Sequence, residues 1–299
     1  MISNIQFFWE VLKQTFKEWN SSSASKDSAS LAYYAIFSIP GLLIIIIWIA
    51  GNFFGEEAIR GEISNQISSI MGQDAAKSIQ DMIARALIDK KNILMKTVGI
   101  GSLVFGSTTL FFQLQHSLNT LWGVQAAPKK ALVKFLLDRA NSLGMILILG
   151  FLLMITMVLS SMISFFNNWI TGYFGFETYM LVEAVNFLIG FGVVMLLFAL
   201  MFKVLPDVQI SWKPVWKGAF LTALLFTLGK FLISLYFSQF KPTSAFGTAG
   251  TVILIMMWIN YSCMLVFFGA KFTQVYTNKR GYKITPSKHA KWMEVKSEA

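Results

Sequence analysis

The sequence predicts an all-α, polytopic membrane bundle with six transmembrane helices. Six apolar runs stand along the 299 residues, at 31–54, 97–122, 142–166, 180–205, 215–237 and 249–276. Each has about the length, roughly 20 residues, that a helix needs to cross the hydrocarbon of a bilayer. Hydrophobic residues make up 55% of the chain and charged residues only 13%, whereas a soluble domain carries about 25% charged residues. Lipid must therefore be the solvent for much of the surface.

The first 30 residues predict an amphipathic cytoplasmic helix followed by a Ser-rich linker. Apolar side chains recur there at helical spacing, at Ile5, Phe8, Leu12, Phe16 and Trp19. A short helix with such a stripe is typical of segments that lie in the membrane interface.

The first apolar run contains Pro40 followed by Gly41. Proline removes a backbone donor and clashes with the preceding turn, so we expect a helix kink at this point. A tolerated bend is the preferred interpretation, and a discontinuous helix that lines a cavity is the alternative.

Residues 55–96 form the one sizeable segment between runs, and they predict two short amphipathic helices on the extracytoplasmic side. Isoleucines recur there at helical spacing on both sides of Gly72. We expect the pair to cap the bundle; lying on the bilayer and meeting a partner remain alternatives. Residues 277–299 predict a basic cytoplasmic tail.

The basic residues are distributed unevenly between the two sides of the predicted membrane. Seventeen of the 25 Lys and Arg fall on the side of the N-terminus, which includes the basic loop 123–141, and seven fall on the other side. The positive-inside rule then places both termini in the cytoplasm. The net charge of +10 favours contact with anionic lipid headgroups as partners rather than with nucleic acid.

Lys230 is the strongest single signal of function, because it is an ionisable residue inside an apolar run. A charge at mid-membrane costs about 2.5–3.5 kcal/mol on insertion scales, so such groups suggest a substrate pathway. Glu183 lies near the outer end of the fourth run at a depth that Lys230 can match. We expect either a Glu183–Lys230 ion pair inside the bundle or separate snorkelling of each group to the outer headgroups.

Three amides and one imidazole complete the candidate substrate pathway: Gln113, His116 and Asn119 at the end of the second run, and Asn260 in the sixth. Such side chains either join helices by hydrogen bonds or line a hydrated cavity. His116 has no second ligand at metal-binding spacing, so no metal site is expected.

Several chemistries have no counterpart in the sequence. It holds no P-loop and no G-x-S-x-G nucleophile elbow, and its carboxylates are scattered rather than clustered. We therefore expect a protein that is not an enzyme and has no cofactor. The single cysteine, Cys263, excludes an intrachain disulfide.

Several motifs, specific as a set, resemble the bacterial YihY/BrkB inner-membrane family, formerly tagged ribonuclease BN. They are Leu31-Ala32-Tyr33-Tyr34 with Pro40, Leu118-Asn119-Thr120-Leu121-Trp122-Gly123-Val124, Leu205-Pro206 before Trp212, Lys217-Gly218-Ala219, Gly229-Lys230, Leu235-Tyr236, and Phe246-Gly247 through Gly269-Ala270. The resemblance implies six spans and a location in the bacterial inner (plasma) membrane. The family's labels concern serum resistance and a nuclease, and some members have been linked to lipid export. This chain departs from the family pattern at Lys271, where an acidic residue is expected.

These observations favour a transporter-like protein that moves an amphipathic or lipid-linked anion without ATP. The alternative is a structural or scaffolding protein of the envelope, whose polar residues only join helices. A ribonuclease is the least favoured function. Substrate, driving force and a homo-oligomeric state are left open.

Overall fold

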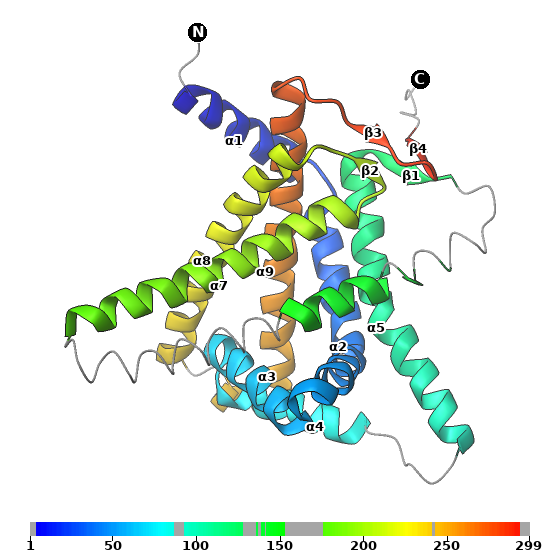
Figure 1. The fold of residues 1–299 in the computed structure, drawn as a ribbon, viewed down its shortest axis with the longest axis vertical. Helices are drawn as coiled ribbons and strands as arrows, with labels where there is room; N and C mark the ends of the chain where they lie inside the picture. Colours follow the sequence, from blue (N-terminus) through cyan, green and yellow to red (C-terminus); the bar gives the residue numbers. More distant parts are fainter. Residues whose placement is uncertain are drawn as a thin grey trace.

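The computed structural model describes residues 4–86, 93–127, 136, 139–140, 142–152, 176–240 and 243–293. Its helices are α1 (Asn4–Asn20), α2 (Ala24–Phe54), α3 (Glu56–Met71), α4 (Gln73–Ala86), α5 (Ile93–Trp122), an unlabelled helix Ser142–Leu152, α7 (Phe176–Val204), α8 (Trp212–Phe240) and α9 (Thr243–Lys279). Helix α7 runs obliquely across the bundle, whereas α2, α5, α8 and α9 run between two ends of the molecule (Figure 1). We call these the α1 end and the α3–α4 end.

Three of the described helices are long and apolar enough to cross a membrane, over Phe187–Val204, Trp212–Ile233 and Val252–Lys279. The two halves of α2, Ala24–Ile39 and Gly41–Phe53, make a fourth span if they are counted together. The chain is therefore a helical, multi-pass membrane protein. Most of the predicted third span, 142–166, lies outside the described residues, and the count of six remains a prediction.

The α2 helix bends by 50° between its two halves, at Pro40. The helix continues through the bend to Phe54, which is the geometry of a kinked helix rather than of two separate ones. Gly55 ends α2 with a φ of 87°, a left-handed conformation that glycine adopts without a steric penalty. Its N–H donates to the carbonyl of Gly51 at 2.8 Å.

The chain between the first and second runs forms two helices, α3 and α4, at one end of the bundle (Figure 1). Apolar side chains on their inner faces, such as Ile59, Ile63 and Ile79, are buried. The two helices pack against each other and against α2, α8 and α9. This is the arrangement expected of a cap on the bundle.

The α9 helix is the centre of the bundle, because it packs against α1, α2, α5 and α8. One face of α1 covers the last turns of α9. Val11 and Thr15 are fully buried there, and edge-to-face aromatic pairs join Phe7 to Tyr276 and Trp19 to Phe268. A second stripe of α1 remains uncovered, with Ile5, Trp9 and Phe16 well exposed.

The C-terminal tail carries two short strands that the sequence does not predict. The strand β3 (Thr285–Pro286) pairs with β2 (Val208–Gln209), and β4 (Ala290–Trp292) pairs with β1 (Val124–Ala126), both antiparallel. These strands tie the tail to the segments that follow α5 and α7. The α1 end is thus closed by bonds between distant parts of the chain.

Candidate functional site

Close packing of α8 on α9 sets the position of Lys230. Gly218 and Thr222 on α8 face Gly269 and Thr273 on α9 in a reciprocal arrangement. A Cβ on Gly218 would overlap the hydroxyl of Thr273, and a Cβ on Gly269 would overlap the hydroxyl of Thr222. Each threonine hydroxyl donates to the carbonyl four residues earlier in its own helix, at 2.8 Å. Small residues let the two backbones approach closely, which is typical of helix pairs in membranes.

Lys230 follows the third close contact of this pair, where the backbone of Gly229 meets the hydroxyl of Tyr261. The Lys230 side chain is half-buried, and its neighbours Phe231 and Leu232 are 61% and 63% exposed. Among the described residues, Lys230 has no hydrogen-bond or ion-pair partner. The Glu183 side chain lies outside the described part of the structure, so the Glu183–Lys230 pair remains a prediction.

The other predicted pathway residues do not form one group with Lys230. Asn260 stands on α9 beside Tyr261 and is half-buried. Gln113 and His116 lie on α5, and α9 stands between α5 and α8 (Figure 1). His116 is exposed and Gln113 is half-buried. Lys230 and Asn260 therefore lie on α8 and α9, apart from Gln113 and His116 on α5.

Asn119 joins two segments of the α1 end. It is 7% exposed, its side-chain amide donates to the Asp207 carboxylate at 2.9 Å, and its side-chain oxygen accepts the Asp207 backbone N–H at 2.7 Å. The Asp207 carbonyl in turn accepts the N–H of Ser287. Asn119 thus links the end of α5, the turn after α7 and the C-terminal tail. Sequence reasoning did not foresee Asp207 as its partner.

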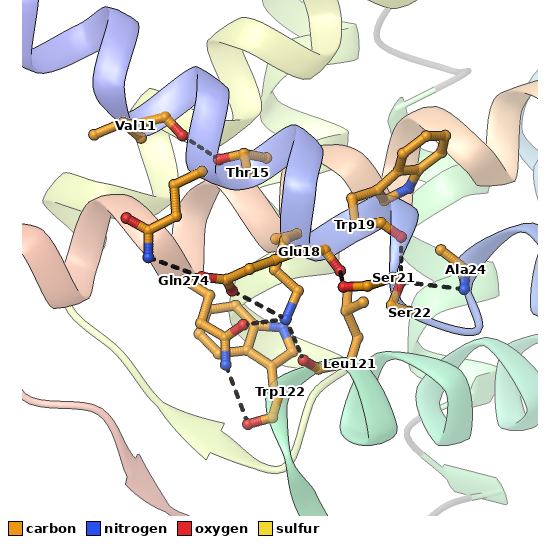
Figure 2. A network of polar contacts seen from close by, with 12 residues as sticks. Val11, Thr15, Glu18, Trp19, Ser21, Ser22, Ala24, Leu121, Trp122 and Gln274 are labelled. Carbon is orange, nitrogen blue, oxygen red and sulfur yellow. Dashed lines mark hydrogen bonds and ion pairs between the residues drawn. The ribbon is translucent and has the colours of Figure 1, made fainter.

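Lys271 lies at a buried polar contact between three helices, and sequence reasoning noted it only as a departure from the family pattern. Its side chain is buried, and Nζ donates to the Leu121 carbonyl at 3.0 Å and to Gln274 Oε1 at 2.7 Å. Gln274 also donates to the Trp122 carbonyl at 3.3 Å. Figure 2 shows Glu18 of α1 reaching toward this point, where its carboxylate lies 3.8 Å from Nζ.

This contact explains why a cation suits position 271. Leu121 and Trp122 are the last residues of α5, where carbonyls without helical partners carry the negative end of the helix dipole. An ammonium satisfies such carbonyls, and Glu18 adds a nearby negative charge. A carboxylate at 271 would face the same carbonyls and Glu18, and would be repelled by both.

The described residues contain no group of three His, Cys, Asp or Glu side chains arranged to hold a metal ion. The polar contacts at the α1 end instead join helices, strands and tail. Two further cations of this end have partners: Lys203 donates to the Ile210 carbonyl, and Lys279 lies 3.4 Å from Glu10. Within the described structure, Lys230 differs from them in having no such partner.

The chain is similar to known membrane proteins. The family model of virulence factor BrkB matches residues 15–294. A UPF0761 membrane protein of Pseudoalteromonas translucida is 26% identical over 83% of this chain and 79% of its own length. One from Haemophilus influenzae is 26% identical over 86% of this chain and 91% of its own length.

A longer UPF0761 membrane protein, from Saccharophagus degradans, is 23% identical over 94% of this chain. The match spans 62% of the length of that relative. No solved structure matches the chain. Because the family model covers nearly all of the sequence, this chain belongs to the virulence factor BrkB family of membrane proteins.

Proposed function

We propose that this protein is a six-span protein of the bacterial inner membrane that translocates an amphipathic anion, such as a lipid or a lipid-linked precursor. Both termini lie on the cytoplasmic side, where most of the basic residues fall. The course of the long helices between the α1 end and the α3–α4 end supports this topology (Figure 1). With no ATP-binding motif in the sequence, transport is passive or driven by a gradient.

The observation that carries the proposal is the ammonium of Lys230. It lies three residues before Ile233, where the apolar span of α8 ends, which is about 5 Å along the helix. A lysine stem spans roughly 6 Å at ordinary bond lengths, so the charge stands just inside the edge of this span, within reach of the headgroups. An ammonium that no described side chain neutralises attracts an anionic ligand at that depth, and intramembrane charges of this kind mark transport pathways.

The alternative function is structural, and two contacts favour it. Asn119 and Lys271 make hydrogen bonds and an ion pair that join α5, α9, α1 and the tail. If the remaining polar groups act in the same way, the protein is a scaffold of the envelope. This alternative accounts for the α1 end, but it leaves Lys230, which has no partner among the described residues, without a role.

Reconstitution into liposomes tests the two functions against each other. Lipid scrambling and anion flux are compared for the wild type, Lys230→Met and Lys213→Met, which removes an exposed cation from the first turn of the same helix. We expect flux in the wild type, loss in Lys230→Met and no change in Lys213→Met. Absence of flux in all three supports the scaffold, and equal flux in all three removes Lys230 from the mechanism.

A further inference from the structure

The face of α8 that carries Lys230 is the face that packs into the bundle. Lys230 is the fourth member of a row on one side of the helix, spaced by four, three and four residues, which begins with Ala219, Ala223 and Phe226. Both alanines are fully buried, and the Phe226 ring packs edge-to-face on buried Phe198 of α7 at 5.7 Å. The Lys230 stem therefore leaves α8 from an inward-facing position.

The hydroxyl of Tyr261 on α9 lies at the point of α8 from which Lys230 projects. It occupies the space that a Cβ on Gly229 would need, so only glycine at 229 admits it. Two aromatic contacts hold the Tyr261 ring there. The ring lies 6.2 Å from that of Trp258, which in turn packs edge-to-face on Phe226 at 5.5 Å.

The two polar groups that meet here are both hydrogen-bond donors. An ammonium carries three N–H donors and a phenol carries one O–H donor. Lys230 and Tyr261 make no hydrogen bond to each other or to another described residue, and Lys230 has no ion pair or ring contact there. Because no described protein group accepts from them, both donors are available to one anionic ligand at the contact of α8 with α9.

We infer that Lys230 and Tyr261 together bind one phosphate group, carried by a lipid. The inference rests on the proposed function for the role of Lys230, and it deepens that function by naming the chemistry of the ligand and a second residue that selects it. The unesterified oxygens of a phosphate point in different directions, so one accepts from the ammonium of α8 and another from the phenol of α9. Lysine binds phosphate as a point charge, and the hydroxyl fixes where the bound group sits.

The surroundings favour a lipid as the carrier of the phosphate. Lys230 stands about 5 Å inside the end of the apolar span of α8, close to the level of the headgroups. Exposed apolar side chains flank the contact on both helices, with Leu232 of α8 63% exposed and Met257 of α9, one turn before Tyr261, 61% exposed. Acyl chains cover such side chains in a membrane, so a lipid phosphate reaches the two donors while its tails stay in the bilayer.

Equilibrium binding to the detergent-purified full chain tests this inference. The probes are fluorescent phosphatidylglycerol and a fluorescent diacylglycerol that has the same acyl chains but no phosphate. We expect the wild type to prefer phosphatidylglycerol. Tyr261→Phe loses only the hydroxyl and should bind this lipid about tenfold more weakly, because a hydrogen bond to a charged group disappears. Its affinity for diacylglycerol should not change.

Matched variants separate the two donors from general effects of substitution. Tyr276→Phe removes a hydroxyl from the same helix, where the ring packs on Phe7 of α1, and it should bind phosphatidylglycerol as the wild type does. Lys230→Met should weaken binding more than Tyr261→Phe, and Lys230→Arg should retain most of the affinity because the charge remains. Lys213→Met, which removes an exposed cation of α8, should have no effect.

Three results overturn the inference. The first is wild-type affinity for phosphatidylglycerol in folded Tyr261→Phe; if that variant does not fold, Gly229→Ala decides, because its added methyl group displaces the hydroxyl and should weaken binding to a similar extent. The second is equal affinity of the wild type for diacylglycerol and phosphatidylglycerol. The third is displacement of the lipid by inorganic phosphate but not by chloride at equal ionic strength, which assigns the site to a free anion.

The inference and the proposed function fail in different measurements. Loss of flux in Lys230→Met, together with wild-type lipid binding in Tyr261→Phe, leaves the proposed function standing and removes the phosphate site. Weaker phosphatidylglycerol binding in both variants, together with no flux in wild-type liposomes, leaves the phosphate site standing and removes transport.

Discussion

Replacement of Lys271 by methionine should destabilise the protein by about 2–4 kcal/mol. The change deletes the donor to the Leu121 carbonyl and to Gln274 Oε1, and a hydrogen bond from a charged group contributes about 1.5–3 kcal/mol. Both acceptors are left at a site where the lysine is only 9% exposed. Methionine keeps the apolar stem packed, so the expected loss lies below the sum of two such bonds. The pair with Glu18 adds little, because that carboxylate is 41% exposed and 3.8 Å away.

The single cysteine supplies the assay. Cys263 is partly buried in α9, so a thiol-reactive dye reports its exposure as the detergent-solubilised protein is heated. At about 2 °C for each kcal/mol, Tm should fall by about 4–8 °C in Lys271→Met. Lys279→Met is the matched control, since it removes a lysine from the same helix that pairs with exposed Glu10 at 3.4 Å, and its Tm should change by about 1 °C or less.

Equal Tm shifts in these two variants refute the reasoning. The double variant Glu18→Lys/Lys271→Glu then separates helix capping from ion pairing. It preserves opposite charges at the two positions but turns a carboxylate toward the last carbonyls of α5. We expect it to remain destabilised, because the dipole of α5 favours a cation at this end. Recovery of the wild-type Tm shows instead that the Glu18 pair, and not the cap, stabilises this site.

Two further predictions follow from the packing. Gly218→Ala and Gly269→Ala should each destabilise the protein by about 1–3 kcal/mol, because the added methyl group overlaps a threonine of the facing helix. The control is Gly190→Ala, whose added Cβ meets no atom within 4 Å and which should not lower Tm. A similar loss of stability in Gly190→Ala contradicts the close packing of α8 on α9. The second prediction concerns α1 and uses spin labels in a Cys263→Ser background. A label at Ile5, which is 82% exposed on an apolar stripe, should be quenched by oxygen, because oxygen concentrates in lipid. A label at Lys17 should instead be quenched by a water-soluble nickel reagent. Equal quenching by both reagents at both positions means that α1 does not lie in the membrane interface.

The positions of the long helices could be read from the sequence because hydropathy is a local property. The second apolar run ends at Trp122, as α5 does, and the first ends at Phe54, as α2 does. The starts of two helices differ from the starts of their apolar runs. The α2 helix begins at Ala24, ahead of the run at 31, and α9 begins at Thr243, ahead of the run at 249. Helices continue past the hydrocarbon into polar turns, where composition no longer marks them.

The polar contacts could not be read in this way because their partners are distant in sequence. Lys271 and Leu121 are separated by 150 residues, and Asn119 and Asp207 by 88. An amide near the end of an apolar run is compatible with a cavity, a helix contact or a surface. The alternation of hydrophobic and polar residues says nothing about which of these applies. One local signal was available, since Lys271 occupies a place where the family pattern has an acid.

The distribution of polar contacts also constrains the proposed transport of a lipid. The α1 end is tied by Lys271, by the Asn119–Asp207 pair and by the two strand pairs of the tail. Opening a central channel at this end would break several of these bonds at once, each costly when buried. A transport mechanism in which the α1 end stays closed therefore keeps all of these bonds.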